Sequence, residues 1–193
     1  GTLPAEFAPL LKPLLYKPDR NRLETKALEL ACEESGLSAA RLLARCGAIP
    51  SSHDYHFDRF LFEHFPQGTG FGDYQMPQVP EDLPLAEVQA FSIDDAATTE
   101  IDDAFSLQRR GEKLRVGIHI AAPGLAFSPG SALDGIARER LSTAYMPGHK
   151  FTMLPDDVIQ RFSLDHGGER PAVSIYFDVG PDGNVAGRHT RIE

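Results

Sequence analysis

"FSIDDAATTEIDDAFSL" (Phe91–Leu107) decides how this sequence is interpreted, because it crowds carboxylates at the edge of strand-like sequence. The acids within it are Asp94, Asp95, Glu100, Asp102 and Asp103. Apolar residues flank the acids on both sides, in the alternating pattern that is typical of a half-buried strand. Crowded carboxylates repel one another, so either water or a cation must solvate them. The stretch therefore predicts a strand that is preceded by an acidic segment of the chain.

A hard cation is one way to solvate these acids. Carboxylate oxygens suit Mg²⁺, and Mn²⁺ is the alternative. The Ala-Ala-Thr-Thr stretch (96–99) can turn the chain, and Asp94 would then approach the later acids. Adjacent residues of an extended chain point to opposite sides. Asp102 and Asp103 can therefore face one site only if the backbone turns there, or if two metals lie on either side of the chain. A carboxylate-held Mg²⁺ with open positions is typical of phosphoryl chemistry, and a solvated acidic loop is the alternative.

The composition excludes several classes of protein. The chain has 193 residues, 41% of them hydrophobic and 24% charged, as in a soluble globular protein of one or two domains. No apolar run approaches the roughly 18 residues that span a membrane, and the N-terminal sequence lacks the pattern of a secretory signal. Two cysteines make no disulfide framework. We expect a cytoplasmic protein without membrane association.

The net charge of −9 argues against simple electrostatic capture of nucleic acid. Much of this acidity is local, because Glu87–Asp103 holds six acids and no base. Residues 104–193 carry 11 Lys and Arg against 10 Asp and Glu. A bound divalent cation would neutralise part of the acidic stretch.

The N-terminal part of the chain has a helical pattern. Helices are expected over Arg22–Gly36, Ser38–Gly47 and Tyr55–Phe65. Gly36 can end the first helix and Ser38 can cap the second, so the pair resembles a helix-turn-helix. We predict a helical domain over residues 1–65 and a Pro/Gly-rich linker over residues 66–86.

From residue 87 to 193 the pattern changes to short strands separated by turns. Strands are expected over Val88–Ile93, Ala104–Arg110, Leu114–Ala121 and Pro171–Val179. Arg109–Lys113 predicts a hairpin loop, and Pro181–Asn184 predicts a turn. A helix is expected over Ser131–Tyr145, with Ser131 as its N-cap. The fold class is therefore α+β, with a helical first domain and a mixed second one.

Several segments of the second domain resemble the ribonuclease II/ribonuclease R family, whose catalytic part is the RNB domain. The resemblance begins with the acidic stretch, whose family pattern is roughly T-I-D-x6-D-D-A. It continues collinearly through Val116–Ala121, Gly130–Gly148, Met153–Val158 and Phe162–Gly183. It covers the chain from about Val88 onward.

The resemblance implies a hydrolytic, processive 3′→5′ exoribonuclease that uses Mg²⁺ and degrades single-stranded RNA to nucleoside monophosphates. The family's metal-site acids fall on Asp94, Glu100, Asp102 and Asp103. Asp102 matches the acid tied to the chemical step, and Glu100 departs from the aspartate usual in the family. Ala122 also departs, since relatives usually carry an aspartate there.

Two further residues are candidate RNA contacts, Tyr145 on the strength of the same resemblance and Arg170 because it could hold a phosphate or a carboxylate. Tyr145 matches an aromatic residue that packs on nucleotides near the 3′ end. Arg170 is the second candidate, and a structural role is its alternative.

The family domain normally runs to several hundred residues and is often followed by an S1 RNA-binding domain. We therefore expect this chain to be the N-terminal part of a larger enzyme, truncated within the RNB domain. The remainder would lie in the same protein or in a second chain. One alternative is a catalytically impaired RNA-binding relative, suggested by Glu100 and Ala122. Another is a helix-turn-helix regulator using residues 1–65, although residues 1–86 carry 8 bases against 12 acids.

Overall fold

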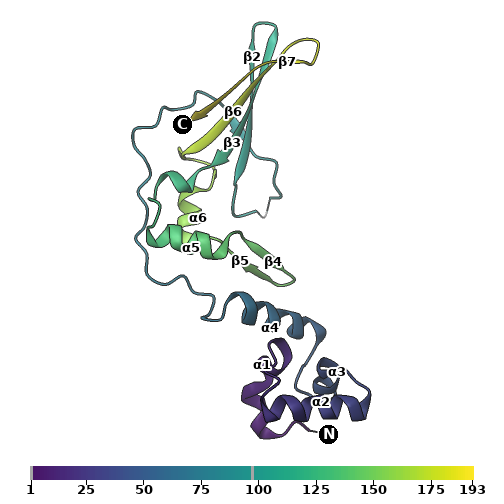
Figure 1. The fold of residues 1–193 in the computed structure, drawn as a ribbon. Helices are drawn as coiled ribbons and strands as arrows, with labels where there is room; N and C mark the ends of the chain where they lie inside the picture. Colours follow the sequence, from purple (N-terminus) through teal and green to yellow (C-terminus); the bar gives the residue numbers. More distant parts are fainter. Residues whose placement is uncertain (1, 97) are drawn as a thin grey trace. The chain divides into compact units, whose positions relative to one another are not determined.

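The computed structural model describes residues 2–96 and 98–193. The chain divides into two compact units, Gly1–Gly70 and Phe71–Glu193, shown along the ribbon in Figure 1. This division falls inside the stretch expected to be a linker. The predicted turn over residues 96–99 includes Ala97, which lies outside the described residues, as does Gly1 at the start of the expected helical domain.

The first unit is helical. Its elements are η1 (Ala5–Leu10), α1 (Leu11–Tyr16), α2 (Leu23–Ser35), α3 (Ala39–Arg45) and α4 (Ser52–His64). Gly36 ends α2 in the left-handed conformation, with φ 66°, and the Ser38 hydroxyl accepts a hydrogen bond from the backbone N–H of Arg41 at the start of α3. Both caps match the sequence prediction. Leu14, Leu28 and Leu43 form the small core between these helices.

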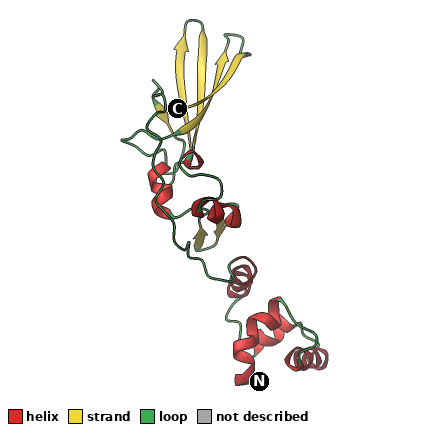
Figure 2. Cartoon of the chain, turned by 60° about the vertical axis from the view of Figure 1, so that its left-hand side comes forward, coloured by secondary structure: helices red, strands yellow, loops and turns green. Residues whose placement is uncertain are grey.

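A five-stranded antiparallel sheet dominates the second unit (Figure 2). Its strands are β1 (Ala90–Phe91), β2 (Asp103–Arg110), β3 (Lys113–Ala121), β6 (Ala172–Val179) and β7 (Val185–Ile192), and they lie in the order β1-β2-β3-β6-β7. A two-residue turn at Gly111, with φ 61°, closes the β2–β3 hairpin, where Arg110 pairs with Lys113. The predicted α+β class is confirmed. The first expected strand is shorter than predicted, since only two of its residues pair.

Helices and a small hairpin lie at one end of the sheet (Figure 1). They are η2 (Pro123–Leu125), α5 (Ala132–Arg140), β4 (Ala144–Met146), β5 (His149–Phe151) and α6 (Asp156–Phe162). Ser131 caps α5 as predicted. The expected extension of this helix to Tyr145 is wrong. The chain leaves the helix at Leu141, which has φ 65°, and Tyr145 then pairs with Lys150 across the β4–β5 hairpin.

A compact apolar cluster holds these helices in place. Leu133 of α5 packs against Leu154, Val158 and Phe162 from the α6 region. All four side chains are almost completely buried. Burying residues of this size stabilises the fold by roughly 1.5–3 kcal/mol each.

The two faces of the sheet differ in chemistry, and the polar face is the covered one. Ser106, His119, Ser174 and Tyr176 point to one side and are buried. The opposite side carries alternating apolar residues of β2, β3, β6 and β7, and several remain open to solvent: Leu107 (55% exposed), Leu114 (40%), Ile120 (41%) and Ile192 (48%). An antiparallel sheet with one covered face normally buries its apolar side. In this sheet the polar side is the covered one.

Across residues 2–96 and 98–193, none of the helices has the length and apolar character needed to cross a membrane.

Candidate active site

The acidic segment is held at the start of β2 by backbone hydrogen bonds on both sides. The N–H of Ile101 donates to Oγ of Ser163 (2.8 Å), and its carbonyl accepts from the N–H of Leu164 (2.8 Å). The carbonyl of Asp102 accepts from the N–H of Ala121 at the end of β3 (2.8 Å). The acids are thus carried by backbone that is anchored to the end of α6 and to the central sheet.

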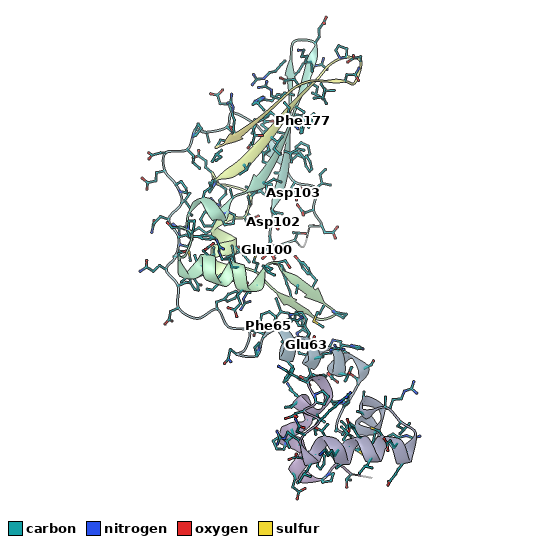
Figure 3. The ribbon with its side chains drawn as sticks, in the orientation of Figure 1. Glu63, Phe65, Glu100, Asp102, Asp103 and Phe177 are labelled. Atoms are coloured by element: carbon teal, nitrogen blue, oxygen red, sulfur yellow. The ribbon has the colours of Figure 1, made fainter. Side chains whose placement is uncertain are left out.

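The predicted metal-site acids interact electrostatically around Asp102. Figure 3 shows Glu100, Asp102 and Asp103 following one another where the sheet approaches α5. Partial desolvation raises the pKa of Asp102, and the negative charges of Glu100 and Asp103 raise it further. Lys150 opposes this shift, and Asp94 adds a smaller increase in the pKa. The other three acids therefore lie within electrostatic reach of the Asp102 carboxyl group.

Glu100 already has a cationic partner. Its carboxylate forms an ion pair with the ammonium group of Lys150 on β5. Partial burial alone would lower the pKa of Lys150, but its hydrogen bond to Glu100 and the carboxylate charge outweigh that effect, so the pKa of Lys150 is raised. One of the four acids is thus paired with a cationic side chain of the protein itself.

The donor chemistry fits a hard divalent cation. Carboxylate oxygens are the ligands that Mg²⁺ and Mn²⁺ take, and repulsion at Asp102 is the kind that such an ion relieves. In the part of the chain that the structure describes, no group of three His, Cys, Asp or Glu side chains is already gathered closely enough to hold a metal. Assignment of Asp94, Glu100, Asp102 and Asp103 as metal ligands therefore stays a prediction.

The two predicted RNA contacts lie in different surroundings. Tyr145 is 72% exposed on β4, and its ring lies 5.7 Å from Nζ of Lys150, close to the acids. Arg170 precedes β6 and donates to the carbonyl of Glu169 (2.9 Å). Its Nε is buried without a hydrogen-bond partner among the described residues. It lines a cavity that none of the four predicted metal-site acids lines.

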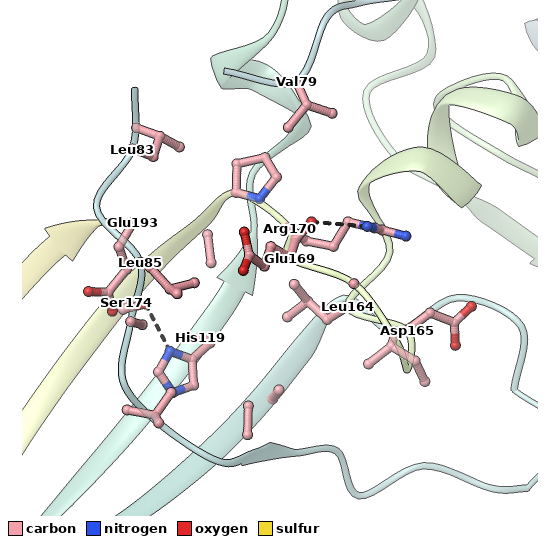
Figure 4. A pocket seen from close by; sticks show the side chains of 18 of the residues that line it. Val79, Leu83, Leu85, His119, Leu164, Asp165, Glu169, Arg170, Ser174 and Glu193 are labelled. Atoms are coloured by element: carbon pink, nitrogen blue, oxygen red, sulfur yellow. Dashed lines mark hydrogen bonds between the residues drawn. The ribbon is translucent and has the colours of Figure 1, made fainter. Parts of the chain in front are cut away.

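That cavity, of about 660 Å³, lies between the segment 79–92 and the polar face of the sheet (Figure 4). At its wall, Nδ1 of His119 lies 2.8 Å from Oγ of Ser174, and Nε2 lies 2.9 Å from Oγ of Ser106. Burial lowers the pKa of His119, which keeps the imidazole neutral and able to donate to one hydroxyl and accept from the other. This network was not predicted from the sequence, although its three members alternate with apolar residues along their strands.

A comparison with protein-family models matches the RNB domain over residues 83–192, more than half of the chain. This chain belongs to the RNB domain family, and the predicted resemblance is confirmed.

Individual relatives agree with this assignment. Exoribonuclease 2 of Serratia proteamaculans is 38% identical over 104 residues, which cover 53% of this chain and 16% of that protein. Two Arabidopsis thaliana proteins, DIS3-like exonuclease 2 and inactive exonuclease DIS3L2, are each 36% identical over 124 residues, covering 58% of this chain and 12% of theirs. The chain thus spans less than a fifth of the length of these relatives.

Solved structures support the same fold. Mycoplasma genitalium RNase R in complex with ribose-methylated single-stranded RNA superimposes with a TM-score of 0.52 at 20% identity. The match covers 56% of this chain and 17% of that one. At this level of identity the likeness shows the fold alone.

Proposed function

We propose that this chain contributes the acidic part of the active site of an exoribonuclease. The activity is Mg²⁺-dependent, with Mn²⁺ as a substitute, and it hydrolyses single-stranded RNA from the 3′ end to nucleoside monophosphates. The observation that carries the proposal is the RNB match over residues 83–192, which includes the acidic segment that leads into β2. The Serratia relative, named Exoribonuclease 2, supports it.

Each residue of the site has a definite part in this proposal. Asp94, Asp102 and Asp103 hold the metal, which when bound supplies Lewis acidity for attack of water on the terminal phosphodiester. The anchored backbone of Asp102 fixes its carboxylate relative to the sheet. The exposed ring of Tyr145 stacks on a base near the 3′ end, which contributes about 1–3 kcal/mol without sequence preference. Arg170 is a second contact for RNA.

We further propose that the chain works as part of a larger RNB enzyme. The open apolar face of the sheet supports this, because Leu107, Ile120 and Ile192 are each more than 40% exposed on a continuous sheet surface. Such a face is normally covered by further protein. The remainder of the RNB domain, followed by an S1 domain, would supply this cover and the basic RNA channel, in the same protein or in a second chain. A cytoplasmic location remains a prediction from the sequence.

Degradation of end-labelled single-stranded RNA tests the activity. The complete natural polypeptide that contains this chain is incubated with the RNA and Mg²⁺, with EDTA as the control. Release of mononucleotides from the 3′ end, blocked by EDTA, is the expected result. Absence of cleavage with intact RNA binding would instead show that the protein is a catalytically impaired relative.

That second candidate has an observation in its favour. Glu100 is engaged by Lys150, so the site has fewer free carboxylates than its sequence contains. One Arabidopsis relative carries the name inactive exonuclease DIS3L2, at the same identity as DIS3-like exonuclease 2. The assay above separates the two candidates directly.

A further inference from the structure

The β4–β5 hairpin that carries Tyr145 is too small to fix its own position. Each strand has three residues, and an isolated two-stranded hairpin is at best marginally stable in water. Two hydrogen bonds between described residues contribute to holding its base. The guanidinium of Arg140 donates to the carbonyl of Thr152 (3.0 Å), and the N–H of Met153 donates to Oγ1 of Thr143 (3.2 Å).

Lys150 provides an attachment farther out along the hairpin. It lies directly opposite Tyr145, and its ammonium group is 5.7 Å from the centroid of that ring. This is within the roughly 6 Å at which a cation is attracted to an aromatic face. The same ammonium group forms the ion pair with Glu100, which lies 50 residues away in the sequence.

Glu100 is a suitable anchor for this contact. Its side chain is only 15% exposed, against 36% for Lys150, so the pair is partly shielded from water. The neighbouring residue Ile101 is fixed to the end of α6 by two hydrogen bonds. Because the anchor itself is held, the pair can transmit a fixed position to the hairpin.

We propose that Lys150 is a positioning residue that ties the Tyr145 hairpin to Glu100 and so sets the position of the Tyr145 ring beside the acids. This inference rests on the proposed function and deepens it. Tyr145 would hold a base of single-stranded RNA at a defined distance from Asp102, while Glu100 serves the hairpin through Lys150. Glu100 is then a part of the substrate-positioning machinery, and the three aspartates are left for the metal.

The first test uses neither RNA nor metal. Amide hydrogen exchange of residues 144–151 is measured by mass spectrometry on the complete natural polypeptide, in EDTA, for Lys150→Met and Glu100→Gln. Both variants are expected to exchange faster in this segment. Lys150→Arg, which keeps the charge, and Lys113→Met, at an exposed lysine of the β2–β3 hairpin, should exchange as the wild type does. Unchanged exchange in both Lys150→Met and Glu100→Gln overturns the proposal.

The second test measures binding of single-stranded RNA in EDTA. Lys150→Met and Glu100→Gln should each weaken binding roughly fivefold, the lower end of what loss of a stacking contact produces. The Glu100 variant is decisive, because removal of a negative charge near RNA would otherwise tighten binding. Tighter binding by Glu100→Gln therefore contradicts a positioning role.

A double variant completes the design. If Lys150 acts through the tyrosine, adding Lys150→Met to Tyr145→Ala should cause no further loss of affinity. A full additional loss would mean that Lys150 contacts RNA independently, and would overturn the proposal. If the wild type does not bind RNA at all, the proposed function fails, and hydrogen exchange alone still decides whether Lys150 holds the hairpin.

Discussion

Ser163→Ala tests the anchoring of the acidic segment. The Ser163 hydroxyl is the acceptor for the N–H of Ile101 at 2.8 Å, and the two residues are 3% and 8% exposed. Water cannot readily replace this hydroxyl, so the substitution leaves a buried donor unpaired, at a cost of about 1–3 kcal/mol. The second bond, from Leu164 to the carbonyl of Ile101, remains. We therefore expect local loosening and not global unfolding.

Native-state hydrogen exchange of a peptide covering residues 101–110 gives the local opening free energy. It should fall by about 1–3 kcal/mol in Ser163→Ala. Ser128→Ala, at an exposed serine, is the matched control and should stay within roughly 0.5 kcal/mol of the wild type. A change in Ser163→Ala no larger than that of the control would refute the view that this bond anchors the acids.

Three further substitutions test the sheet and the helical core. Burial lowers the pKa of His119 in the folded state, whereas the imidazole of the unfolded chain titrates near about 6.5. The neutral His119 side chain therefore contributes fully to stability above that pH. This contribution is lost as the pH falls through the lower folded-state pKa. Unfolding of His119→Gln should accordingly show a weaker loss of stability on the acid side than the wild type. Gly117→Ala should destabilise by roughly 1–3 kcal/mol, because the added Cβ would lie 2.8 Å from Nε2 of His119 and 3.0 Å from the Tyr176 ring. Gly135→Ala, in open space on α5, is its control and should be neutral or stabilising in the same urea titration. Phe162→Ala should cost about 3–5 kcal/mol by urea unfolding, and a loss below about 1 kcal/mol would contradict its place in the core.

Local features of the fold were predictable from the sequence. Gly36 and Ser131 act within a few residues of their own positions, and the structure places each where the helix ends or begins. The β2–β3 hairpin was also predictable, because alternation and a glycine-containing turn are both short-range signals. The resemblance to the RNB family predicted which acids belong to the metal site, and sequence periodicity alone could not have identified them.

Features that depend on distant pairing were not predictable. Tyr145 was expected in a helix because its own neighbours favour one, but strand pairing with Lys150 overrides that preference. The ion pair of Lys150 with Glu100 joins residues 50 positions apart, and His119 meets a serine 55 positions away. The alternation of polar and apolar residues along the strands also predicts that the two faces of the sheet differ. It does not indicate that the polar face of this sheet is the covered one.

The central claim is that Asp102 acts in the chemical step and not in holding RNA. Cleavage and binding of labelled single-stranded RNA by Asp102→Asn, measured in parallel with the wild type on the complete natural polypeptide in Mg²⁺, test it most directly. We predict that the wild type releases nucleoside monophosphates from the 3′ end, whereas Asp102→Asn binds RNA with nearly unchanged affinity and releases none. Cleavage at the wild-type rate by Asp102→Asn, or an equal loss of binding and cleavage, would contradict the account.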